Sequence, residues 1–557
     1  MAVKYLYGVN ANKIQKYVFN SNKFKEIVGA SKIVEELSGA FGLLNANQNS
    51  NKYNFEIIQN TTGSFKAVFS DTESLNQFII DFNKKLAINA PNLLITQVIL
   101  QKEESDINNN FTSVLQEIDE QLSIKRNFPD TLDYSPMISD IDASSGFSSI
   151  KSVKIDDDII DSNDILDDGN ESADFEKCAK LYLFKKSGNR SFKSFFGNIN
   201  IADIFSDNEK DLINLNFDNI YFELEFDKIK NAKSLIAVVH SDGNGTGFLK
   251  KDIFSKDGNA EKNFDNKNEY KEFSDNLNKT VKESAFYAII NTFKDLIKEN
   301  KRKLPFRIFT LSGEDFNFVC QPDYVFELLK NYMLKYEELT SKYLKKFLKK
   351  IGIDTMTTTA GIAFSKSHFP FYMSFELAES LCGRAKKITK ENIKDGKQYK
   401  VPAALLFHFM QSSYFNDLEH VINYERKSHD KSVDFLFGPY TIKGGYSYGF
   451  TYPDIGLLIE TAKYIKSEKG LRSAFRETLS VININNEKLG INFLKRANEV
   501  NKVSMALPIE NIKKLNETDY YKQSLENNKL NNNEKTKKSS IYDIISIENS
   551  LDVKWNK

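Results

Sequence analysis

The order of predicted elements occurs twice along this chain, and that repetition constrains the fold more than any other feature. The first copy begins with a strand at Lys4–Val9 and continues through a helix to the hairpin Tyr53–Phe69 and the helix Leu75–Leu86. The second copy begins with a strand at Leu235–His240 and continues through a helix to the hairpin Phe306–Cys320 and another helix. The sequence therefore predicts two α/β units of the same design.

Further elements complete the expected α/β class, with helices and antiparallel strands mixed in the α+β manner. We expect one continuous helix over Lys13–Leu37 in the first unit. In the second unit, Thr357–Phe364 predicts a last strand that leads into the helix Phe375–Lys387. From about residue 402 to residue 507 the pattern is mostly helical.

These patterns divide the chain into four parts. We expect a first unit over 1–195, a second unit over 215–400, a helical domain over 401–515 and a flexible tail over 516–557. The segment 103–176 is rich in Asp, Ser and Asn, so it is interpreted as an acidic insertion with little core of its own. The tail is rich in Asn and Lys, which favours mobility.

Composition excludes several function classes. The 76 Lys and Arg residues balance 76 Asp and Glu residues, so no global field recruits nucleic acid or an anionic membrane. No run of roughly 18 apolar residues occurs, which argues against a membrane partner. The three cysteines, Cys178, Cys320 and Cys382, are far apart. Their spacing argues against a zinc ribbon or a disulfide framework and favours a reducing compartment, by default the cytoplasm.

The acidic residues distinguish the two copies. When the first strands and the hairpins are aligned, each acidic position of the second copy faces a neutral residue of the first. The pairs are Asn10 with Asp242, Gly63 with Glu314, and Ser64 with Asp315. The alignment predicts one carboxylate-bearing site and one copy without it.

The expected chemistry of that site is metal-assisted. Asp242 ends a strand, while Glu314 and Asp315 lie in a tight hairpin turn beside it. Three converging carboxylates repel one another unless a hard cation neutralises them, and their oxygen atoms suit Mg²⁺ or Mn²⁺. A pair of such ions activates an attacking hydroxyl and stabilises a leaving pyrophosphate, so the constellation predicts nucleotidyl transfer.

Glycines after the strand suggest where a triphosphate binds. Gly243 and Gly245, which flank Asn244, allow the backbone to approach phosphates closely. The motif lacks the lysine half of a Walker loop, which disfavours a P-loop ATPase. Lys386 closes a later helix and could reach the same phosphates. Each feature alone has an ordinary explanation as a turn, a hairpin tip or a helix-end charge; the interpretation depends on their conjunction.

Four segments in order resemble one known family. IAVVHSDGNGTG, FTLSGEDFNFVC and TTTAGIAFSKSHFPFYMSFELAESLCGRAKK resemble the catalytic palm of the polymerase-cyclase large subunit of type III CRISPR effector complexes. The opening YLYGVNANKIQKYVFNSNKFKEIVGASKIVEELS is similar to that subunit's first palm, and LFGPYTIKGGYSYGFTYPDIGLLIETAKYI to the start of its helical domain. The resemblance implies two ferredoxin-like palms, related to GGDEF nucleotide cyclases, and a C-terminal helical domain.

The resemblance also implies a function. Such a subunit acts with sibling subunits, guide RNA and target RNA, and converts ATP into a nucleotide second messenger, a cyclic oligoadenylate or another adenylated product. Carried over by position, the metal ligands would be Asp242, Glu314 and Asp315. The residues on the ATP side would be Gly243, Asn244, Gly245, Ser312, Gly313, Lys386 and, in the first palm, Ser31.

The sequence departs from the family pattern in ways that change the expected chemistry. The usual GGDD turn reads Ser312-Gly313-Glu314-Asp315, and Asn244 stands where a second aspartate is expected. No HD nuclease domain precedes the first palm, so DNA cleavage is not expected. The zinc-binding cysteines usual between the palms are also absent. Two alternatives stay open: a free-standing GGDEF-like cyclase, and a catalytically degenerate scaffold subunit.

Overall fold

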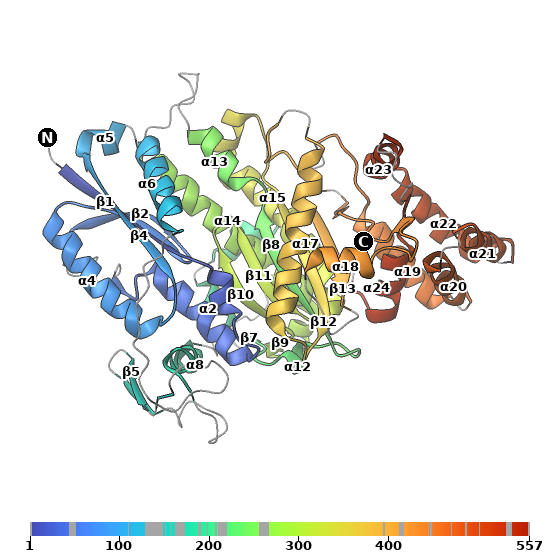
Figure 1. Cartoon of the computed structure of the whole chain (residues 1–557), viewed down its shortest axis with the longest axis horizontal. Coiled ribbons are helices and arrows are strands. Elements are labelled where there is room, and N and C mark those ends of the chain that lie inside the picture. Colours follow the sequence, from blue (N-terminus) through green and yellow to red (C-terminus); the bar gives the residue numbers. More distant parts are fainter. Residues whose placement is uncertain are drawn as a thin grey trace.

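The computed structural model describes most of the chain. The described residues are 3–43, 52–109, 111–127, 149–150, 152–155, 158–161, 173–187, 191–197, 199–206, 209, 220–254, 267–393, 396–410, 417–443, 445, 448–468, 470–484, 487–500, 502–530 and 537–554. Within this part the protein has two mixed α/β units followed by a helical domain (Figure 1). Among the described residues, no helix is long and apolar enough to cross a membrane.

The first unit is a four-stranded antiparallel sheet with the strand order β2-β3-β1-β4. Its strands are β1 (Val3–Ala11), β2 (Phe55–Thr61), β3 (Ser64–Phe69) and β4 (Ile95–Glu103). Its helices are α1 (Ile14–Val18), α2 (Phe24–Ser38), α4 (Thr72–Asn89), α5 (Glu104–Asn109) and α6 (Phe111–Lys125). The sequence β1, helices, β2, β3, α4, β4 in this sheet order is the ferredoxin-like topology, which confirms the expected design.

One helix expected in this unit is divided into two. The segment Lys13–Leu37 was expected to be continuous, but α1 ends at Val18 and α2 begins at Phe24. Phe19, between them, packs its ring against Phe309 and Phe375 of the second unit, with centroids 5.7 and 3.9 Å away. Burial of this aromatic ring between the units accounts for the break, which helical periodicity alone does not reveal.

The second unit repeats the topology and extends it. Its sheet has the order β10-β11-β8-β12-β13-β15, so β10, β11, β8 and β12 correspond to β2, β3, β1 and β4. The strands are β8 (Leu235–Gly243), β10 (Phe306–Ser312), β11 (Asp315–Cys320), β12 (Thr358–Lys366), β13 (Ala404–Phe409) and β15 (Tyr440–Thr441). The helices are α13 (Thr246–Phe254), α14 (Lys267–Lys298), α15 (Val325–Tyr343), α16 (Lys345–Leu348), α17 (Phe371–Glu391) and α18 (Leu418–Tyr424).

The expectation of a mostly helical chain from residue 402 is therefore wrong at its start. Ala404–Phe409 is β13, a fully buried strand that pairs parallel to β12. Its apolar run is buried on both faces, and periodicity does not separate such a strand from a buried helix.

The hairpins of both units share an irregularity. In the first unit the register of β2 against β3 shifts between Ile57 and Gln59, and in the second that of β10 against β11 shifts between Ile308 and Thr310. Each shift leaves one residue, Ile58 or Phe309, out of the ladder at the same distance from its turn. A β-bulge is a specific feature of a hairpin and not a defect. Because both hairpins carry it at the same position, the two units share this local detail as well as their topology.

Part of the expected insertion belongs to the first core. Helices α5 and α6 cover the face of the sheet that carries Leu6, Ile58 and Val68, so the expectation that 103–176 builds little core is wrong for 104–125. Its amphipathic helices were obscured by the Asp- and Ser-rich stretch that follows. Most of that stretch lies outside the described residues; β5 (Ser152–Ile155) and β6 (Asp158–Asp161) form a hairpin within it.

The segment between the units supplies short elements. These are α8 (Phe175–Ser187), α9 (Phe192–Phe196), α10 (Ile201–Ile204), β7 (Tyr221–Phe222) and α12 (Phe226–Ile229). Strand β7 pairs with β9 (Lys303–Leu304), a short strand that follows α14 in the second unit. Helix α8 lies so close to α2 that a Cβ on Gly29 would be 1.8 Å from the carbonyl oxygen of Lys180. The absence of a side chain at Gly29 is therefore needed for this packing.

The C-terminal region is helical and includes most of the expected tail. Its elements are β14 (Val433–Asp434), α19 (Ile455–Ser467), α20 (Leu471–Asn483), α21 (Glu487–Val500), α22 (Lys502–Asn516), α23 (Asp519–Leu530), β16 (Lys537–Lys538) and α24 (Ile541–Ser550). Helix α24 is buried, and Asp543 on it is ion-paired to Arg426 at 2.5 Å. The expectation of a mobile tail is therefore wrong for 519–530 and 537–554; the apolar run in α24 was obscured by its Asn- and Lys-rich surroundings.

One hydrophobic cluster spans the two units. Residues of α2, such as Ile27 and Val34, pack with Val238 of β8 and Phe309 of β10. In Figure 1 the helix α2 lies beside the edge of the second sheet at β10. One face of the second sheet therefore meets α17 and the first unit, while α14 and α15 cover the opposite face.

A glycine on β12 tests the packing that positions α17. A Cβ on Gly361 would lie 1.9 Å from the carbonyl oxygen of Ala378, so Gly361→Ala must push α17 away from the sheet. We expect a loss of roughly 1–3 kcal/mol in the free energy of unfolding, measured by urea denaturation. The control is Gly383→Ala on the solvent-exposed side of α17, where the added methyl meets nothing within 4 Å and should stabilise the helix. Equal effects of the two substitutions would contradict this packing.

The buried ion pair tests whether α24 is part of the fold. Asp543 also accepts a hydrogen bond of 2.6 Å from Tyr440, and Asp543→Ala leaves Arg426 buried without that carboxylate. We expect a loss of about 3–5 kcal/mol in unfolding free energy. Glu517→Ala, which removes an exposed pair with Lys513, should cost no more than about 1 kcal/mol. A mobile tail would make both substitutions equally harmless.

Candidate active site

Two aspartates meet at the ends of adjacent strands in the second sheet. Ser241 of β8 pairs with Phe316 of β11, so the next residues toward the hairpin turn, Asp242 and Asp315, lie opposite each other. Their carboxyl groups are close enough for the charge of Asp242 to raise the pKa of the buried Asp315 carboxyl. Side chains alternate along a strand, so both aspartates share the face that carries Val238 and Val319, against which the first unit packs.

A lysine from α17 completes this cluster. The ammonium group of Lys386 lies 2.5 Å from Oδ2 of Asp242 and donates to the carbonyl oxygen of Gly243 at 2.7 Å. Both charged side chains are mostly withdrawn from solvent, with exposed fractions of 14% for Lys386 and 32% for Asp242. The lysine thus compensates part of the negative charge where the two carboxyl groups meet.

The charge of Asp315 is disfavoured in this arrangement. Burial is the main cause that raises the pKa of the Asp315 carboxyl well above its ordinary value, and the nearby Asp242 and Glu314 raise it further. Lys386 acts in the opposite direction but does not cancel these effects. An additional cation would lower the pKa of this carboxyl group, because a nearby positive charge favours the ionised form.

Glu314 lies on the other side of the strand end, contrary to the expectation of three converging carboxylates. Its Cβ occupies the space beside Gly243, 2.8 Å from where a Cβ of that glycine would stand. Its charge raises the pKa of Tyr336, on α15, and of Lys250, on α13. Among the residues that the structure describes, no group of three or more His, Cys, Asp or Glu side chains is placed to hold a metal ion. The predicted trio is therefore an aspartate pair, with Glu314 turned toward the α15 face.

The turn after β8 differs from the expected phosphate loop. The amide of Asn244 is buried; it donates to Thr357 and Pro402 at 2.9 and 3.3 Å and accepts from Thr359 at 2.8 Å. The backbone N–H of Asn244 donates to the carbonyl oxygen of Thr357. These bonds leave neither group for a nucleotide, so the assignment of Asn244 to ATP binding is corrected to a structural role.

The glycines of the two turns have different surroundings. Gly245 adopts a φ of +62° and packs against the backbone of Gln398 and Tyr399, so it serves close packing. Gly313 adopts a φ of +65° with open space beside it, which leaves its backbone accessible. Ser312 ends β10 and pairs with Asp315; its side chain lies outside the described part of the chain. Of the expected loop residues, Gly313 has the most accessible backbone for a ligand.

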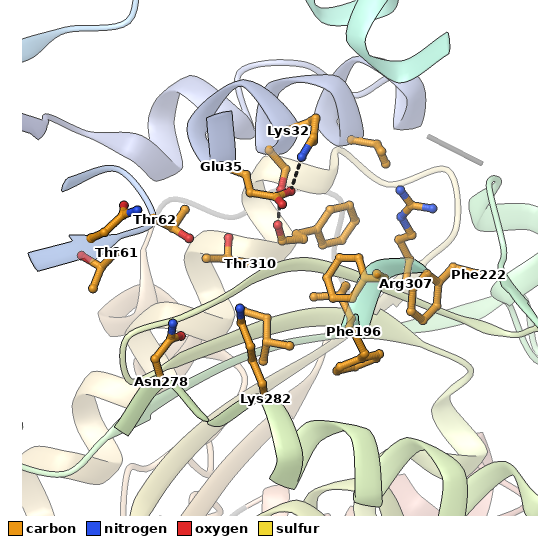
Figure 2. Close-up of a pocket in the computed structure, with 17 residues that line it drawn as sticks. Lys32, Glu35, Thr61, Thr62, Phe196, Phe222, Asn278, Lys282, Arg307 and Thr310 are labelled. Carbon is orange, nitrogen blue, oxygen red and sulfur yellow. Dashed lines mark hydrogen bonds and ion pairs between the residues drawn. The ribbon is translucent and has the colours of Figure 1, made fainter. Parts of the chain in front are cut away.

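A cavity lies between the two units at the β10 edge of the second sheet, with α2 on one side of this edge and α14 on the other (Figure 2). Its volume is about 250 Å³, and its walls come from α2, the end of β2, α14, β10, α9 and β7. Ser31, expected on the ATP side of the first palm, lines it and donates a hydrogen bond to the carbonyl oxygen of Phe309. Lys32 lines it too, ion-paired to Glu35 at 2.9 Å.

The cavity and the aspartate pair are close neighbours in the sheet. Thr310, on the cavity wall, pairs with Asn317, while Ser312 pairs with Asp315. Two residues along a strand span roughly 7 Å and return to the same face. A ligand in the cavity can therefore extend toward Asp242 and Asp315.

Several cavity residues were missed by the sequence interpretation. Asn278 and Lys282 come from α14, and Arg307 comes from β10. The guanidinium of Arg307 lies 5.7 Å from the ring centroid of Phe222. The spacing of Asn278 and Lys282 at i and i+4 places them on one helix face, but the same spacing is common on solvated helices. Only the approach of the first unit shows that this face borders a cavity.

The aspartate pair has the donors that a hard cation needs. Carboxylate oxygens suit Mg²⁺ or Mn²⁺, and a cation would offset the burial and the neighbouring negative charges that raise the pKa of Asp315. Lys386 already places one positive charge on Asp242. The residues fit a divalent cation held by Asp242 and Asp315, with further ligands supplied by water or phosphate.

Comparisons with known proteins identify structural neighbours at low identity. The chain matches no family model and no curated protein. A crystal structure of a Csm1-Csm4 cassette in complex with cA4 matches 89% of this chain and 64% of that chain, at 12% identity and a TM-score of 0.49. Csm1 of T. onnurineus matches 91% of this chain and 65% of that chain, at 12% identity and a TM-score of 0.47.

A third neighbour is a Csm1-Csm4 subcomplex of the type III-A CRISPR-Csm interference complex. It matches 69% of this chain and 53% of that chain, at 12% identity and a TM-score of 0.41. The chain thus spans less than two thirds of the length of each of these structures. The neighbours are Csm1 proteins of type III-A CRISPR-Csm complexes.

The raised pKa of Asp315 predicts how stability depends on pH. Because this pKa is higher in the folded than in the unfolded chain, ionisation costs stability as pH rises from the ordinary Asp value, near 4, toward the folded value. Without divalent ions, Asp315→Asn should therefore gain Tm relative to the wild type as pH rises from 4 to 7. Ser64→Ala, at the corresponding neutral position of the first unit, should show a pH-independent difference in the same thermal scans. A constant difference for Asp315→Asn would refute this account of the site.

Proposed function

We propose that this chain is a metal-dependent nucleotidyltransferase of a type III CRISPR antiviral complex. It would use ATP to make a nucleotide second messenger, a cyclic oligoadenylate or another adenylated product, after the complex pairs guide RNA with target RNA. The observation that carries the proposal is the aspartate pair Asp242 and Asp315, which only one of two copies of the same fold retains, next to a cavity that both copies line.

The first copy supports this division of labour. Asn10 and Ser64 pair at the position that Asp242 and Asp315 occupy in the second copy, and the Ser64 hydroxyl donates to Asn10 Oδ1 at 2.5 Å. The first unit thus has the same paired positions at the strand ends, but with neutral side chains in place of the two carboxyl groups. It contributes walls to the cavity, including Ser31, rather than cation ligands.

Three residues of the second unit would have direct roles in the proposed reaction. Asp242 and Asp315 would hold Mg²⁺ or Mn²⁺, which, when bound, polarises the phosphate under attack and stabilises the developing charge. Lys386 would bind phosphate oxygens, since its ammonium group already lies at the carboxylate that a cation would neutralise. The hydroxyl of one nucleotide attacks the α-phosphorus of a second, a phosphodiester bond forms, and pyrophosphate leaves.

The geometry supports bringing two nucleotides together. One would place its triphosphate by Asp242, Asp315 and the accessible backbone of Gly313, and the other would occupy the cavity lined by Ser31. Holding both in one cleft converts a bimolecular reaction into an effectively intramolecular one. The four motifs that resemble the CRISPR subunit, in their order along the chain, support sibling subunits and RNA as partners and the cytoplasm as location.

The test is product formation by the purified chain, with and without its guide complex and matching RNA. Labelled ATP with Mg²⁺ or Mn²⁺ should give product only when target RNA is present, and mass spectrometry identifies that product. Asp315→Ala should reduce the rate at least about 1000-fold, because it removes half of the cation-binding pair. Assembly, measured by co-purification of the complex, should be unchanged.

Control variants separate this function from the alternatives. Ser64→Ala changes the matching position of the first unit and should keep full activity. Product from the isolated chain without RNA would favour a free-standing GGDEF-like cyclase. No product from the wild type under any condition would favour a scaffold subunit, and loss of assembly in Asp315→Ala would show that this residue supports the fold instead.

A further inference from the structure

We propose that Asn278 and Lys282, on α14 of the second unit, determine which ligand the inter-unit cavity accepts. Asn278 would read an amino-purine base, and Lys282 would bind the anionic part of the same nucleotide. The inference rests on the proposed function for the identity of the substrate class. Its physical basis is the set of unsatisfied groups on the cavity wall.

Asn278 carries a buried polar atom that lacks a partner. Its side-chain oxygen Oδ1 is withdrawn from solvent and accepts no hydrogen bond from the described protein. Figure 2 shows Asn278 and Lys282 standing on the same helix and pointing toward the strand that carries Thr310. A buried acceptor without a partner costs free energy, so a ligand that donates a hydrogen bond there would recover it.

Lys282 supplies the charge. Its side chain is solvent-accessible, and within the described part of the chain it forms no ion pair or hydrogen bond. Lys32, across the cavity, is instead paired to both Glu35 and Glu36 at 2.9 Å. Arg307 adds a further positive charge to the wall. The cavity therefore favours an anion, and Lys282 is the cation best placed to move toward it.

The amide of Asn278 suits adenine in particular. An asparagine side chain offers a hydrogen-bond acceptor and two donors, and adenine offers an amino group beside a ring nitrogen acceptor. With Oδ1 as the unpartnered acceptor, the amide accepts from the adenine amino group and donates to N7 beside it. At the same N7 edge, hypoxanthine, the base of ITP, offers two acceptors, N7 and a carbonyl in place of the amino group, and leaves the acceptor of Asn278 unpaired.

Apolar rings close one side of the cavity. Phe196 and Phe222 come from α9 and β7, the segment between the units, and lie on one side of the cavity in Figure 2. Both rings are buried in the core, with exposed fractions of 7% and 2%. They bound the cavity without distinguishing one base from another, so the selection between bases is left to Asn278.

The experiment measures equilibrium binding of ATP and of ITP to the full chain in EDTA, by calorimetry. The wild type should bind ATP at least about tenfold more tightly than ITP. Asn278→Ala should reduce that preference to less than about threefold, mainly by weakening ATP binding. Lys282→Met should weaken both nucleotides equally and flatten the dependence of affinity on salt, because it removes a charge rather than a base contact.

The chelator and one control variant keep the result separable from the proposed catalysis. EDTA removes the divalent cation that turnover would need, so the measurement reports binding alone. Lys271→Met removes an exposed charge on the same helix, away from the cavity, and should bind both nucleotides like the wild type. An unchanged ATP-to-ITP ratio in Asn278→Ala, equal effects of Lys271→Met and Lys282→Met, or no nucleotide binding by the wild type would each overturn the inference.

Discussion

The repulsion between two adjacent carboxyl groups is the constraint around which the second unit is organised. Asp242 and Asp315 meet because β8 and β11 are neighbours that end together, and burial makes their charges costly. Lys386 offsets part of this cost, and α17 holds that lysine in place by packing closely on Gly361. A bound cation would relieve this repulsion. The same two buried carboxyl groups therefore explain both the electrostatics of the site and its proposed metal-dependent chemistry.

The two copies show which parts of the design belong to the fold and which to the site. The sheet order and the hairpin bulge occur in both units, whereas the carboxyl groups occur in one. The bulges at Ile58 and Phe309 survive without catalytic residues nearby in the first unit, which indicates that they serve the geometry of the hairpin. The difference between Ser64 and Asp315 can then be attributed to chemistry.

Much of the fold could be predicted from sequence because local patterns were repeated. The repeated order of strands and helices and the matching hairpins predicted both units and the convergence of Asp242 with Asp315. The position of Glu314 could not be predicted, because one residue's shift in a turn changes the face on which a side chain lies. Burial on both faces concealed β13, and polar surroundings concealed α24.

The cavity residues illustrate a different limit. Asn278 and Lys282 lie on a helix whose periodicity indicates only a helix, and they become significant only because the first unit approaches from far away in the sequence. Local patterns report on the element that carries a residue, whereas a site between units depends on how these units meet. That information resides in contacts such as the ring of Phe19 against Phe309 and Phe375.

The hydrogen bond from Ser31 to Phe309 joins the units at the bulge itself. A bulged residue leaves backbone groups outside the ladder, and here the carbonyl oxygen of Phe309 accepts a hydrogen bond from the neighbouring unit. The bulge occurs in both units, and in the second unit it provides the acceptor for this contact between them. Because the acceptor belongs to β10 and the donor to α2, this bond ties the position of the first unit's helix to the shape of the second unit's hairpin.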